Sequence, residues 1–249
     1  MKLDRVIAVR NSKTVYRDGD RCVKVFHESY SKTDVLNEAL NQARVEELGL
    51  HTPRVLEVTV IDGRWAIVSE YIKGKTLAQL IAENPEKRAE YIELLVDLQT
   101  EMHSRLCPTL NSLKDKMSRM IAQTDFDATT RYDLHTRVAE MPRHNKVCHG
   151  DFIPSNIVIA GDGTPYILDW AHATQGNASA DAARTYLLFW LAGDITGAEI
   201  YLDTFCRKSG TEKQYVQKWM PLVAAAQSVR GNEKEREFLM SWVNDKDHK

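Results

Sequence analysis

The stretch that decides the fold reads Cys148-His149-Gly150-Asp151-Phe152-Ile153-Pro154-Ser155-Asn156, and Asp169-Trp170 follows it. It holds a carboxylate, an amide five residues later and then a second carboxylate. Between the amide and the second carboxylate lie two short apolar runs, 157–159 and 166–168, on either side of Gly161-Asp162-Gly163. Apolar runs that flank such a turn predict a β-hairpin, because glycine and aspartate favour tight turns. This hairpin would hold the amide and the second carboxylate at a fixed separation.

The residues before this stretch, up to about residue 71, are rich in strand signals. Apolar and β-branched runs alternate with Asp-Gly pairs, which is the pattern of antiparallel hairpins. One segment, 34–48, has apolar residues at helical spacing and is followed by Gly49, a typical helix stop. The expected strands are 6–10, 14–17, 21–26, 54–61 and 65–71. The predicted order is therefore β-β-β-α-β-β.

Helical patterns dominate the rest of the chain. The expected helices are 75–82, 85–104, 111–123, 128–140, 180–191, 197–208, 212–229 and 233–243, with a break at Pro221 in the seventh. We predict an α+β fold of two lobes, a small antiparallel β N-lobe with one helix (1–71) and a larger helical C-lobe (72–249). The segment 72–74 is the predicted hinge, and ligands favour the cleft between such lobes.

Composition and charge exclude several classes of protein. The 249 residues carry 33 basic and 35 acidic side chains, a net charge of −2, so nothing suggests a nucleic-acid partner. No window approaches the roughly 18 uninterrupted apolar residues of a membrane helix, and Asp4, Arg5 and Arg10 interrupt any signal-peptide core. We expect a cytoplasmic protein without a membrane partner, and a monomer or weak dimer. The four cysteines form no CxxC pair, so free thiols are expected.

The order of residues from 149 to 170 resembles the protein-kinase pattern H-R-D-x-x-x-x-N followed by D-F-G, with Gly150 in place of the arginine and Trp170 in place of the phenylalanine. The forms H-G-D-x-x-P-x-N and D-W are similar to those of the aminoglycoside phosphotransferase and choline kinase family. The resemblance extends over nearly the whole chain. It implies a protein-kinase-like fold that uses ATP and Mg²⁺ to phosphorylate a hydroxyl group of a small molecule, such as an aminoglycoside-like antibiotic, an amino alcohol or a sugar.

The resemblance also implies roles for the three polar residues of the deciding stretch. Asp151 would accept the proton of the acceptor hydroxyl and orient it. Asn156 and Asp169 would hold Mg²⁺, a hard cation that prefers oxygen ligands. The alternative is that such residues only cap backbone N–H groups in turns.

The expected N-lobe can be tested independently, because a kinase-like small lobe needs a lysine on its third strand and a glutamate on the following helix. Lys24 lies between Val23 and Val25, so its side chain points to the opposite face of the strand from theirs. Glu38 is the matching acid. By resemblance, Lys24 would contact the α- and β-phosphates and Glu38 would hold it in place. The other reading of Lys24 is an exposed strand lysine.

The nucleotide-binding loop departs from the kinase pattern, because residues 10–14 contain no glycine. Without glycine the backbone cannot approach phosphates as freely, so the side chain of Ser12 or Lys13 is a candidate to make the contact. The alternative is that Ser12 and Lys13 are only turn residues. By resemblance, the adenine would lie against the hinge, hydrogen-bonded by backbone groups near Glu70 and Ile72.

Several other residues are expected to serve the structure. His149 is expected to be a buried hydrogen-bonding residue, His103 a core residue, and Asp181 the tie between the catalytic loop and a helix. Acids in the expected helical lobe either line an acceptor pocket or form a solvated face, and four aromatic residues either cage a quaternary ammonium or pack in the core. These acids are Asp125, Asp127 and Asp133, and these aromatic residues are Tyr186, Trp190, Trp219 and Trp242.

The activity has alternatives. Protein kinases place a long activation segment and an A-P-E motif after D-F-G, and this chain has neither, which favours a small-molecule acceptor. A minimal atypical protein kinase remains the alternative enzyme. A nucleotide-binding pseudokinase or regulatory module is the alternative of another class.

Overall fold

The computed structural model describes residues 3, 5–10, 12–229 and 233–244. Asn11, in the glycine-free loop, lies outside the described residues. The chain forms two compact units, Met1–Ala82 with Ser155–Ala173, and Glu83–Pro154 with Thr174–Lys249. The hairpin that follows the catalytic loop therefore packs with the N-terminal residues. The division into lobes at residues 71 and 72 stays a prediction.

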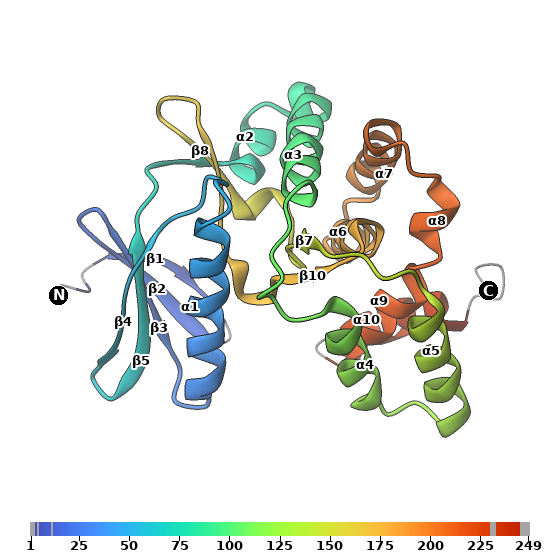
Figure 1. The fold of residues 1–249 in the computed structure, drawn as a ribbon. Coiled ribbons are helices and arrows are strands. Elements are labelled where there is room, and N and C mark those ends of the chain that lie inside the picture. Colours follow the sequence, from blue (N-terminus) through green and yellow to red (C-terminus); the bar gives the residue numbers. More distant parts are fainter. Residues whose placement is uncertain (1–2, 4, 11, 230–232, 245–249) are drawn as a thin grey trace. The chain divides into compact units, whose positions relative to one another are not determined.

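The first unit is built on a five-stranded antiparallel sheet in the order β1-β2-β3-β5-β4 (Figure 1). Asp62 and Gly63 connect β4 to β5 with positive φ angles of 49° and 76°, which suit a two-residue hairpin turn. The predicted hairpins are confirmed. The bounds are Arg5–Val9 for β1, Lys13–Asp18 for β2, Arg21–Phe26 for β3, Val55–Ile61 for β4 and Arg64–Glu70 for β5.

One helix, α1 (Lys32–Glu46), lies along this sheet (Figure 1) and completes the predicted order β-β-β-α-β-β. It begins where the Ser31 hydroxyl accepts a hydrogen bond from the backbone N–H of Asp34 at 3.1 Å, a typical N-cap. Its apolar face buries Val35 and Ala39 against side chains of β3 and β5. That packing fixes the rotation of the helix and so decides which of its polar residues face the sheet.

A second sheet of the first unit has the order β6-β8-β9 and contains the predicted hairpin, with β6 at Gly74–Thr76, β8 at Ile157–Ala160 and β9 at Pro165–Ile167. The prediction of a helix from residue 75 is wrong at its start, because β6 pairs with β8 and α2 spans Leu77–Glu83. Thr76 and Gln79 form reciprocal side chain to backbone hydrogen bonds, at 2.8 and 3.1 Å, that cap α2 at Leu77.

The second unit is helical, apart from a short ribbon of β7 (Lys146–Cys148) and β10 (Thr174–Gly176) that the sequence analysis did not predict. Helix α6 packs against α7, α8 and α9, and α3 packs against α7. The helices are α3 (Arg88–His103), which follows a 3₁₀ turn at Pro85–Lys87, α4 (Leu113–Ala122), α5 (Ala128–Glu140), α6 (Ala178–Leu191), α7 (Ile195–Ser209), α8 (Lys213–Gln217), α9 (Met220–Ser228) and α10 (Glu233–Asn244).

The predicted break at Pro221 is wrong in its position. The chain leaves α8 after Gln217, and Pro221 lies in the first turn of α9. A proline lacks the backbone N–H that has no partner in a first turn anyway, so it starts the helix instead of breaking it.

The described helices include none long and apolar enough to cross a membrane. A mixed sheet-and-helix architecture agrees with the predicted α+β class.

Candidate active site

The backbone that leads into Asp151, in the predicted catalytic loop, is fastened by hydrogen bonds at Gly150 and at Asp151 itself. His149 is fully buried, and its Nδ1 accepts a hydrogen bond from the backbone N–H of Asp151 at 3.2 Å. The backbone N–H of Gly150 donates to Oδ1 of Asp181 on α6 at 2.7 Å. Gly150 has a φ of 79°, a backbone conformation that residues other than glycine rarely adopt. The predicted structural roles of His149 and Asp181 are confirmed.

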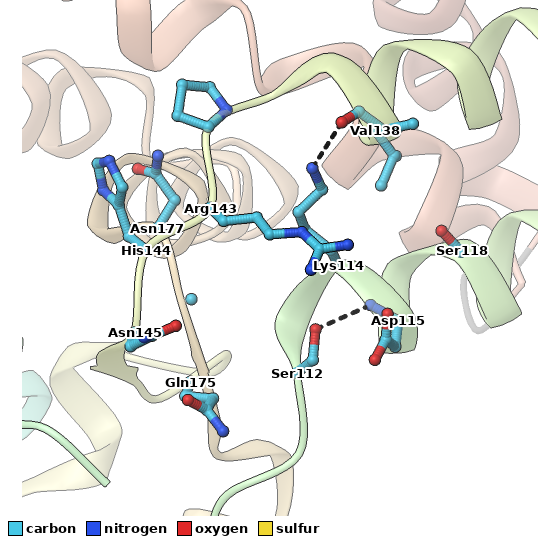
Figure 2. Close-up of a pocket in the computed structure, with 13 residues that line it drawn as sticks. Ser112, Lys114, Asp115, Ser118, Val138, Arg143, His144, Asn145, Gln175 and Asn177 are labelled. Atoms are coloured by element: carbon cyan, nitrogen blue, oxygen red, sulfur yellow. Dashed lines mark hydrogen bonds between the residues drawn. The ribbon is translucent and has the colours of Figure 1, made fainter. Parts of the chain in front are cut away.

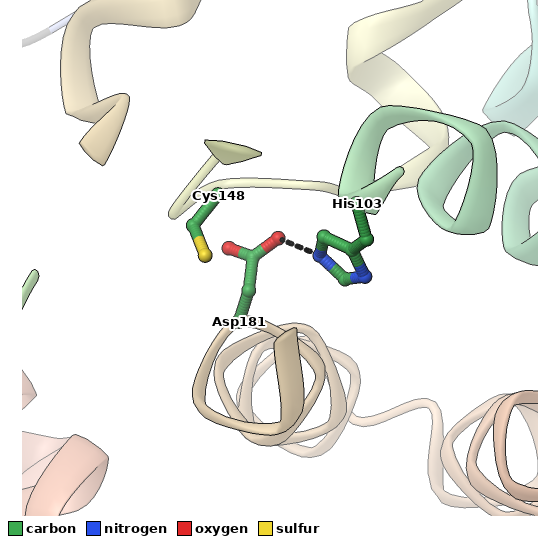
Figure 3. A group of neighbouring side chains, drawn as sticks. All are labelled: His103, Cys148 and Asp181. Carbon is green, nitrogen blue, oxygen red and sulfur yellow. Dashed lines mark hydrogen bonds and ion pairs between the residues drawn. The ribbon is translucent and has the colours of Figure 1, made fainter. Parts of the chain in front are cut away.

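Asp181 sits at the centre of a buried network (Figure 3). Its Oδ2 lies 3.0 Å from Nε2 of His103 on α3 and accepts a 3.3 Å hydrogen bond from Gln99. Burial alone would raise the pKa of Asp181, but the hydrogen bond and charge of His103 and the Gly150 N–H outweigh it, and the pKa is lowered. The carboxylate is therefore ionised and binds α3, α6 and the catalytic loop together. His103 is a core residue, as predicted.

Cys148 lies beside this pair, and its Sγ, His103 and Asp181 offer ligand atoms within 4.8 Å of one another (Figure 3). Burial, and then the charge of Asp181, raise the pKa of the Cys148 thiol well above its ordinary value. A metal needs the thiolate, and both carboxylate oxygens of Asp181 already accept hydrogen bonds. We assign the cluster to fastening the loop.

The hairpin brings Asn156 and Asp169 to its open end. Ile157 pairs with Ile167, and the backbone N–H of Leu168 donates to the carbonyl oxygen of Asn156 at 2.8 Å. Asp169 follows with a φ of 60°, a strained conformation for a non-glycine residue of the kind that collects at functional sites. An amide and an ionised carboxylate at the end of one hairpin are oxygen donors of the type that Mg²⁺ takes, so the pair fits that ion.

The residue after Asp169 anchors this strained turn. The side chain of Trp170 is fully buried, and its indole N–H donates to the hydroxyl of Thr52 at 2.9 Å. The 3₁₀ turn Trp170–His172 packs on α1. Trp170 thus holds the turn through its bulk and its one polar atom.

Lys24 forms ion pairs with both Glu38 and Asp169 in the first unit. Its Nζ lies 2.8 Å from Oε1 of Glu38 and 3.1 Å from Oδ1 of Asp169. Val23 and Val25 are fully buried on the other face, as the alternation of a strand requires. Glu38 is 2% exposed, so α1 places a buried carboxylate directly against the strand lysine. The structure therefore brings together three of the predicted site residues.

The charges of this cluster support each other. Burial alone would raise the pKa of Asp169, but Lys24 and Lys13 outweigh it and hold the pKa well below its usual range. Burial alone would lower the pKa of Lys24, but Asp169 and Glu38 raise it above the ordinary value. Asp169 is therefore a carboxylate and Lys24 an ammonium at neutral pH.

A second lysine joins the cluster. Lys13 is the first residue of β2, and its Nζ lies 3.2 Å from Oε1 of Glu38 and 3.3 Å from Oδ1 of Asp169. Sequence reasoning named Lys13 as a loop candidate for a phosphate contact and did not place it beside Glu38 and Asp169. The register offered the missing signal, because Val15 pairs with Lys24 and Lys13 shares the face of Val15. The two lysines are therefore diagonal neighbours.

The other predicted nucleotide-binding residues lie in the same unit. Ser12 lies in the turn between β1 and β2. Its carbonyl oxygen accepts a hydrogen bond from the N–H of His27, which follows β3, at 2.9 Å. The N–H of Glu70 donates to the carbonyl of Arg54 at 3.0 Å, so Glu70 can offer adenine its carbonyl but not its N–H. Ile72 is half-buried in the irregular segment between β5 and β6. Their contacts with a nucleotide stay a prediction.

A cavity of about 420 Å³ opens in the second unit (Figure 2). Lys114 donates to the carbonyls of Ala139 and Met141 at 2.8 and 2.6 Å and so caps the end of α5. Burial and then the charge of Arg143 lower its pKa. The cavity is lined by Asn145, which precedes β7, and by Gln175 and Gly176 of β10, toward the end of the ribbon where β7 begins, whereas Asp151 follows the other end. We therefore do not assign this cavity to the acceptor.

The three acids expected on a solvated face are exposed and have local partners. Asp125 pairs with Arg236 at 2.6 Å, and Asp127 caps α5 by accepting from the N–H of Thr130 at 2.9 Å. Asp133 lies 4.0 Å from Arg137, one helical turn away. The exposure of all three acids agrees with the solvated-face interpretation.

The aromatic residues of the helical unit pack on one another. Tyr186 contacts Trp190 and Trp242 edge-on, with ring centroids 6.3 and 6.4 Å apart. Trp219 is fully buried. Tyr186 and Trp219 are core residues, as predicted, whereas Trp190 and Trp242 are half-buried and pack at the edge of the core.

Comparison with known proteins identifies relatives. The profile of the phosphotransferase enzyme family matches residues 5–219. A comparison with curated protein sequences finds no match.

Solved structures with the same fold include two aminoglycoside phosphotransferases and a choline kinase. The apo form of a thermostable mutant of APH(4)-Ia is 14% identical, with a TM-score of 0.67 over 95% of this chain and 89% of that one. Aminoglycoside-3'-phosphotransferase of type VIII is 18% identical, with a TM-score of 0.64 over 92% of each chain. Choline kinase LicA from Streptococcus pneumoniae is 12% identical, with a TM-score of 0.60 over 98% of this chain and 93% of that one. The likeness confirms the predicted kinase-like α+β fold.

Some of these structures contain ligands. APH(4)-Ia has been crystallised with hygromycin B together with ADP or AMP-PNP. LicA has been crystallised with AMP.

Proposed function

The chain belongs to the phosphotransferase enzyme family, and from this premise we propose that it transfers the γ-phosphate of ATP, with Mg²⁺, to a hydroxyl group of a small molecule. The observation that carries the proposal is the ion cluster in which Lys24 and Glu38 lie 2.8 Å apart and Lys24 and Asp169 3.1 Å apart. A strand lysine paired with a helix glutamate, beside the carboxylate that ends a hairpin, is the arrangement with which protein kinases transfer phosphate. Nucleotide complexes of APH(4)-Ia and LicA support it.

The first unit binds the nucleotide. Lys24 donates to the α- and β-phosphates, and Glu38 holds its ammonium group in place. Ser12 lies beside the phosphates, and the backbone near Glu70 and Ile72 receives the adenine.

Asn156 and Asp169 would hold Mg²⁺ through an amide and a carboxylate oxygen. When bound, Mg²⁺ would supply positive charge against the charge that develops on the transferred phosphoryl group. The hairpin and the buried Trp170 keep these two oxygen donors at a fixed separation.

Asp151 accepts the proton of the acceptor hydroxyl as its oxygen forms a bond to the γ-phosphorus and the bond from that phosphorus to the β-phosphate oxygen breaks. ADP leaves with the electron pair of that bond. A carboxylate of ordinary strength is sufficient, because the loose transition state asks little of the base and depends mostly on position. His149 and Asp181 supply that position by fastening the loop backbone.

The acceptor is a small molecule. Only the 3₁₀ turn Trp170–His172 and the short strand β10 separate Asp169 from α6 at Ala178, which leaves no long segment to bind a peptide. An aminoglycoside-like antibiotic, an amino alcohol and a sugar are the classes to test, and hygromycin B in APH(4)-Ia is a precedent for the first. The predictions of a cytoplasmic protein and of a monomer or weak dimer stand beside this proposal.

The test is phosphoryl transfer from γ-labelled ATP with Mg²⁺ to pools of aminoglycosides, amino alcohols, amino acids and sugars. Transfer to one pool by the wild type, abolished in Asp151→Ala, is the expected result. Transfer to a protein acceptor instead would favour an atypical protein kinase. Nucleotide binding without transfer to any pool or protein would favour a pseudokinase.

A further inference from the structure

The ion cluster of the first unit contains one lysine more than the pairing of strand lysine and helix glutamate needs. Glu38 and Asp169 carry two negative charges, and Lys24 and Lys13 balance them. Lys13 is only 12% exposed. A lysine side chain loses much rotamer freedom and hydration when it is held in this way, so its position calls for a reason.

Stability alone is a weak reason. Replacing a whole buried ion pair by apolar residues of similar size is often neutral or stabilising, so such a pair is weak evidence for a stabilising role. Asp169 and Glu38 each already have Lys24 as a partner at 3.1 Å or less. Each acid therefore has a lysine partner without Lys13, whose charge compensates the second carboxylate.

The contacts of the two lysines differ in kind. Lys24 makes one hydrogen bond to each acid, at 2.8 and 3.1 Å. Lys13 lies between both oxygens of each acid, at 3.2 and 3.4 Å from Glu38 and at 3.3 and 3.4 Å from Asp169. All four contacts of the Lys13 ammonium group are longer than the two contacts of Lys24, so no single oxygen holds it closely. Lys13 is thus the more easily displaced of the two.

Lys13 also lies in the turn where kinases carry the glycines that this chain lacks. It closes the turn between β1 and β2, where its carbonyl oxygen accepts from the N–H of Arg10 at 2.9 Å. In kinases this turn covers the phosphates with a flexible backbone. Here a compact ammonium group with three donors stands at the same turn, and a lysine binds phosphate as a point charge.

We propose that Lys13 is a second phosphate-binding lysine that neutralises Asp169 while no nucleotide is bound and exchanges this carboxylate for phosphate oxygens when a divalent cation and nucleotide bind. This inference rests on the proposed function and adds the residue that replaces the glycine-rich loop. Two ammonium groups and a divalent cation around Asp169 repel one another, so the lysine with the longer contacts, Lys13, is the one that moves away. The phosphates supply the negative charge that Lys13 needs after the exchange.

The proposal predicts two effects of opposite sign for Lys13→Met. Without nucleotide, loss of a competing cation should strengthen Mn²⁺ binding by up to about fivefold, the worth of a partly exposed ion pair. With Mn²⁺ present, loss of a charge-assisted hydrogen bond should weaken AMP-PNP binding by about tenfold to a hundredfold. A lysine with a merely structural role would not give this reversal.

The experiment measures Mn²⁺ binding by electron paramagnetic resonance and AMP-PNP binding by calorimetry. Lys13→Arg keeps the charge and should restore nucleotide affinity. Lys32→Met is the matched control, since Lys32 is an exposed lysine of the same unit that lies over the ring of Trp65 at 5.1 Å. It should change neither affinity. Circular dichroism checks the fold of each variant, and Lys13→Gln gives the same two readouts where Lys13→Met does not fold.

The outcomes separate the two proposals. Unchanged affinities in Lys13→Met, or weaker binding of both Mn²⁺ and nucleotide, would overturn the role of Lys13 and leave the proposed function standing. A wild type that binds no nucleotide would overturn the proposed function, and the role of Lys13 with it.

Discussion

Replacing Asp181 by Asn tests whether the buried network holds the catalytic loop. Asp181 is 1% exposed and accepts hydrogen bonds from the Gly150 N–H at 2.7 Å and the Gln99 amide at 3.3 Å, besides its contact with His103 at 3.0 Å. Asn has the same shape but no charge, and one of its two polar atoms is a donor. The variant therefore removes charge from the network without opening a cavity.

The magnitude follows from these contacts. The Gly150 hydrogen bond remains but loses its charge assistance, and His103 can turn its Nε2 into an acceptor for the new amide. The amide of Gln99 then faces another donor and keeps only the hydroxyl of Thr185, at 3.3 Å. Weakening one charged hydrogen bond and leaving one buried donor short of a partner should lower the free energy of unfolding by about 2–4 kcal/mol. The turnover number should fall as well, because the loop that positions Asp151 is loosened. Nucleotide affinity should stay within about twofold, because the residues of the first unit that bind the nucleotide are untouched.

The assay is urea unfolding of wild type and variant, with Asp203→Asn as the matched control. Asp203 is 68% exposed and pairs with Lys213 at 3.0 Å on the surface, so its loss should cost less than about 1 kcal/mol. The pKa of Asp181 is lowered in the folded protein. Its contribution to the free energy of unfolding is therefore complete at pH values above the ordinary aspartate pKa of about 3.9, and it is lost as the pH falls below that value. A difference of less than about 0.5 kcal/mol, or one that grows toward low pH, would refute this account of the loop.

Three further substitutions test other contacts. Glu38→Gln leaves Lys24 only Asp169 as a charged partner, so the Kd for AMP-PNP should rise about tenfold in calorimetry, and an unchanged Kd would contradict the role of Glu38. Gly150→Ala should cost about 1–2 kcal/mol in urea unfolding because φ is 79°, and a neutral result would mean that this backbone relaxes. Trp170→Phe removes the hydrogen bond to Thr52 and leaves a cavity beside the smaller ring, so it should lose about 2–3 kcal/mol in urea unfolding yet keep activity, whereas loss of transfer in the folded variant would show that the indole acts in chemistry.

The sequence predicted the parts of the fold that local signals specify. Strands β2 to β5 alternate with turn residues, and α1 follows a capping serine, so each was visible within a few residues of chain. Strands β6, β7 and β10 were missed because each is three residues long and pairs with a distant segment, as Gly176 does with Lys146. A strand of three residues has no periodicity to detect.

The candidate site divides in the same way. Lys24 and Glu38 could be predicted from strand alternation and helix position, and the structure brings them into contact. The contact of Asp169 with Lys24 could not be predicted from the sequence, because it depends on how the hairpin packs beside α1. Lys13 was visible only as one of two loop candidates. Its place in the cluster requires the β2–β3 register, which the turn at residues 18–20 sets.

The central claim is that Asp151 acts in transfer while the first unit binds the nucleotide. The most direct measurement takes Asp151→Asn beside the wild type and determines both the affinity for AMP-PNP with Mg²⁺ and the rate of transfer to the acceptor found in the pool experiment. We expect an affinity within about twofold of the wild type and a rate lower by about 10²–10⁴-fold, the usual contribution of a general base. A wild-type rate in the folded variant would contradict the claim.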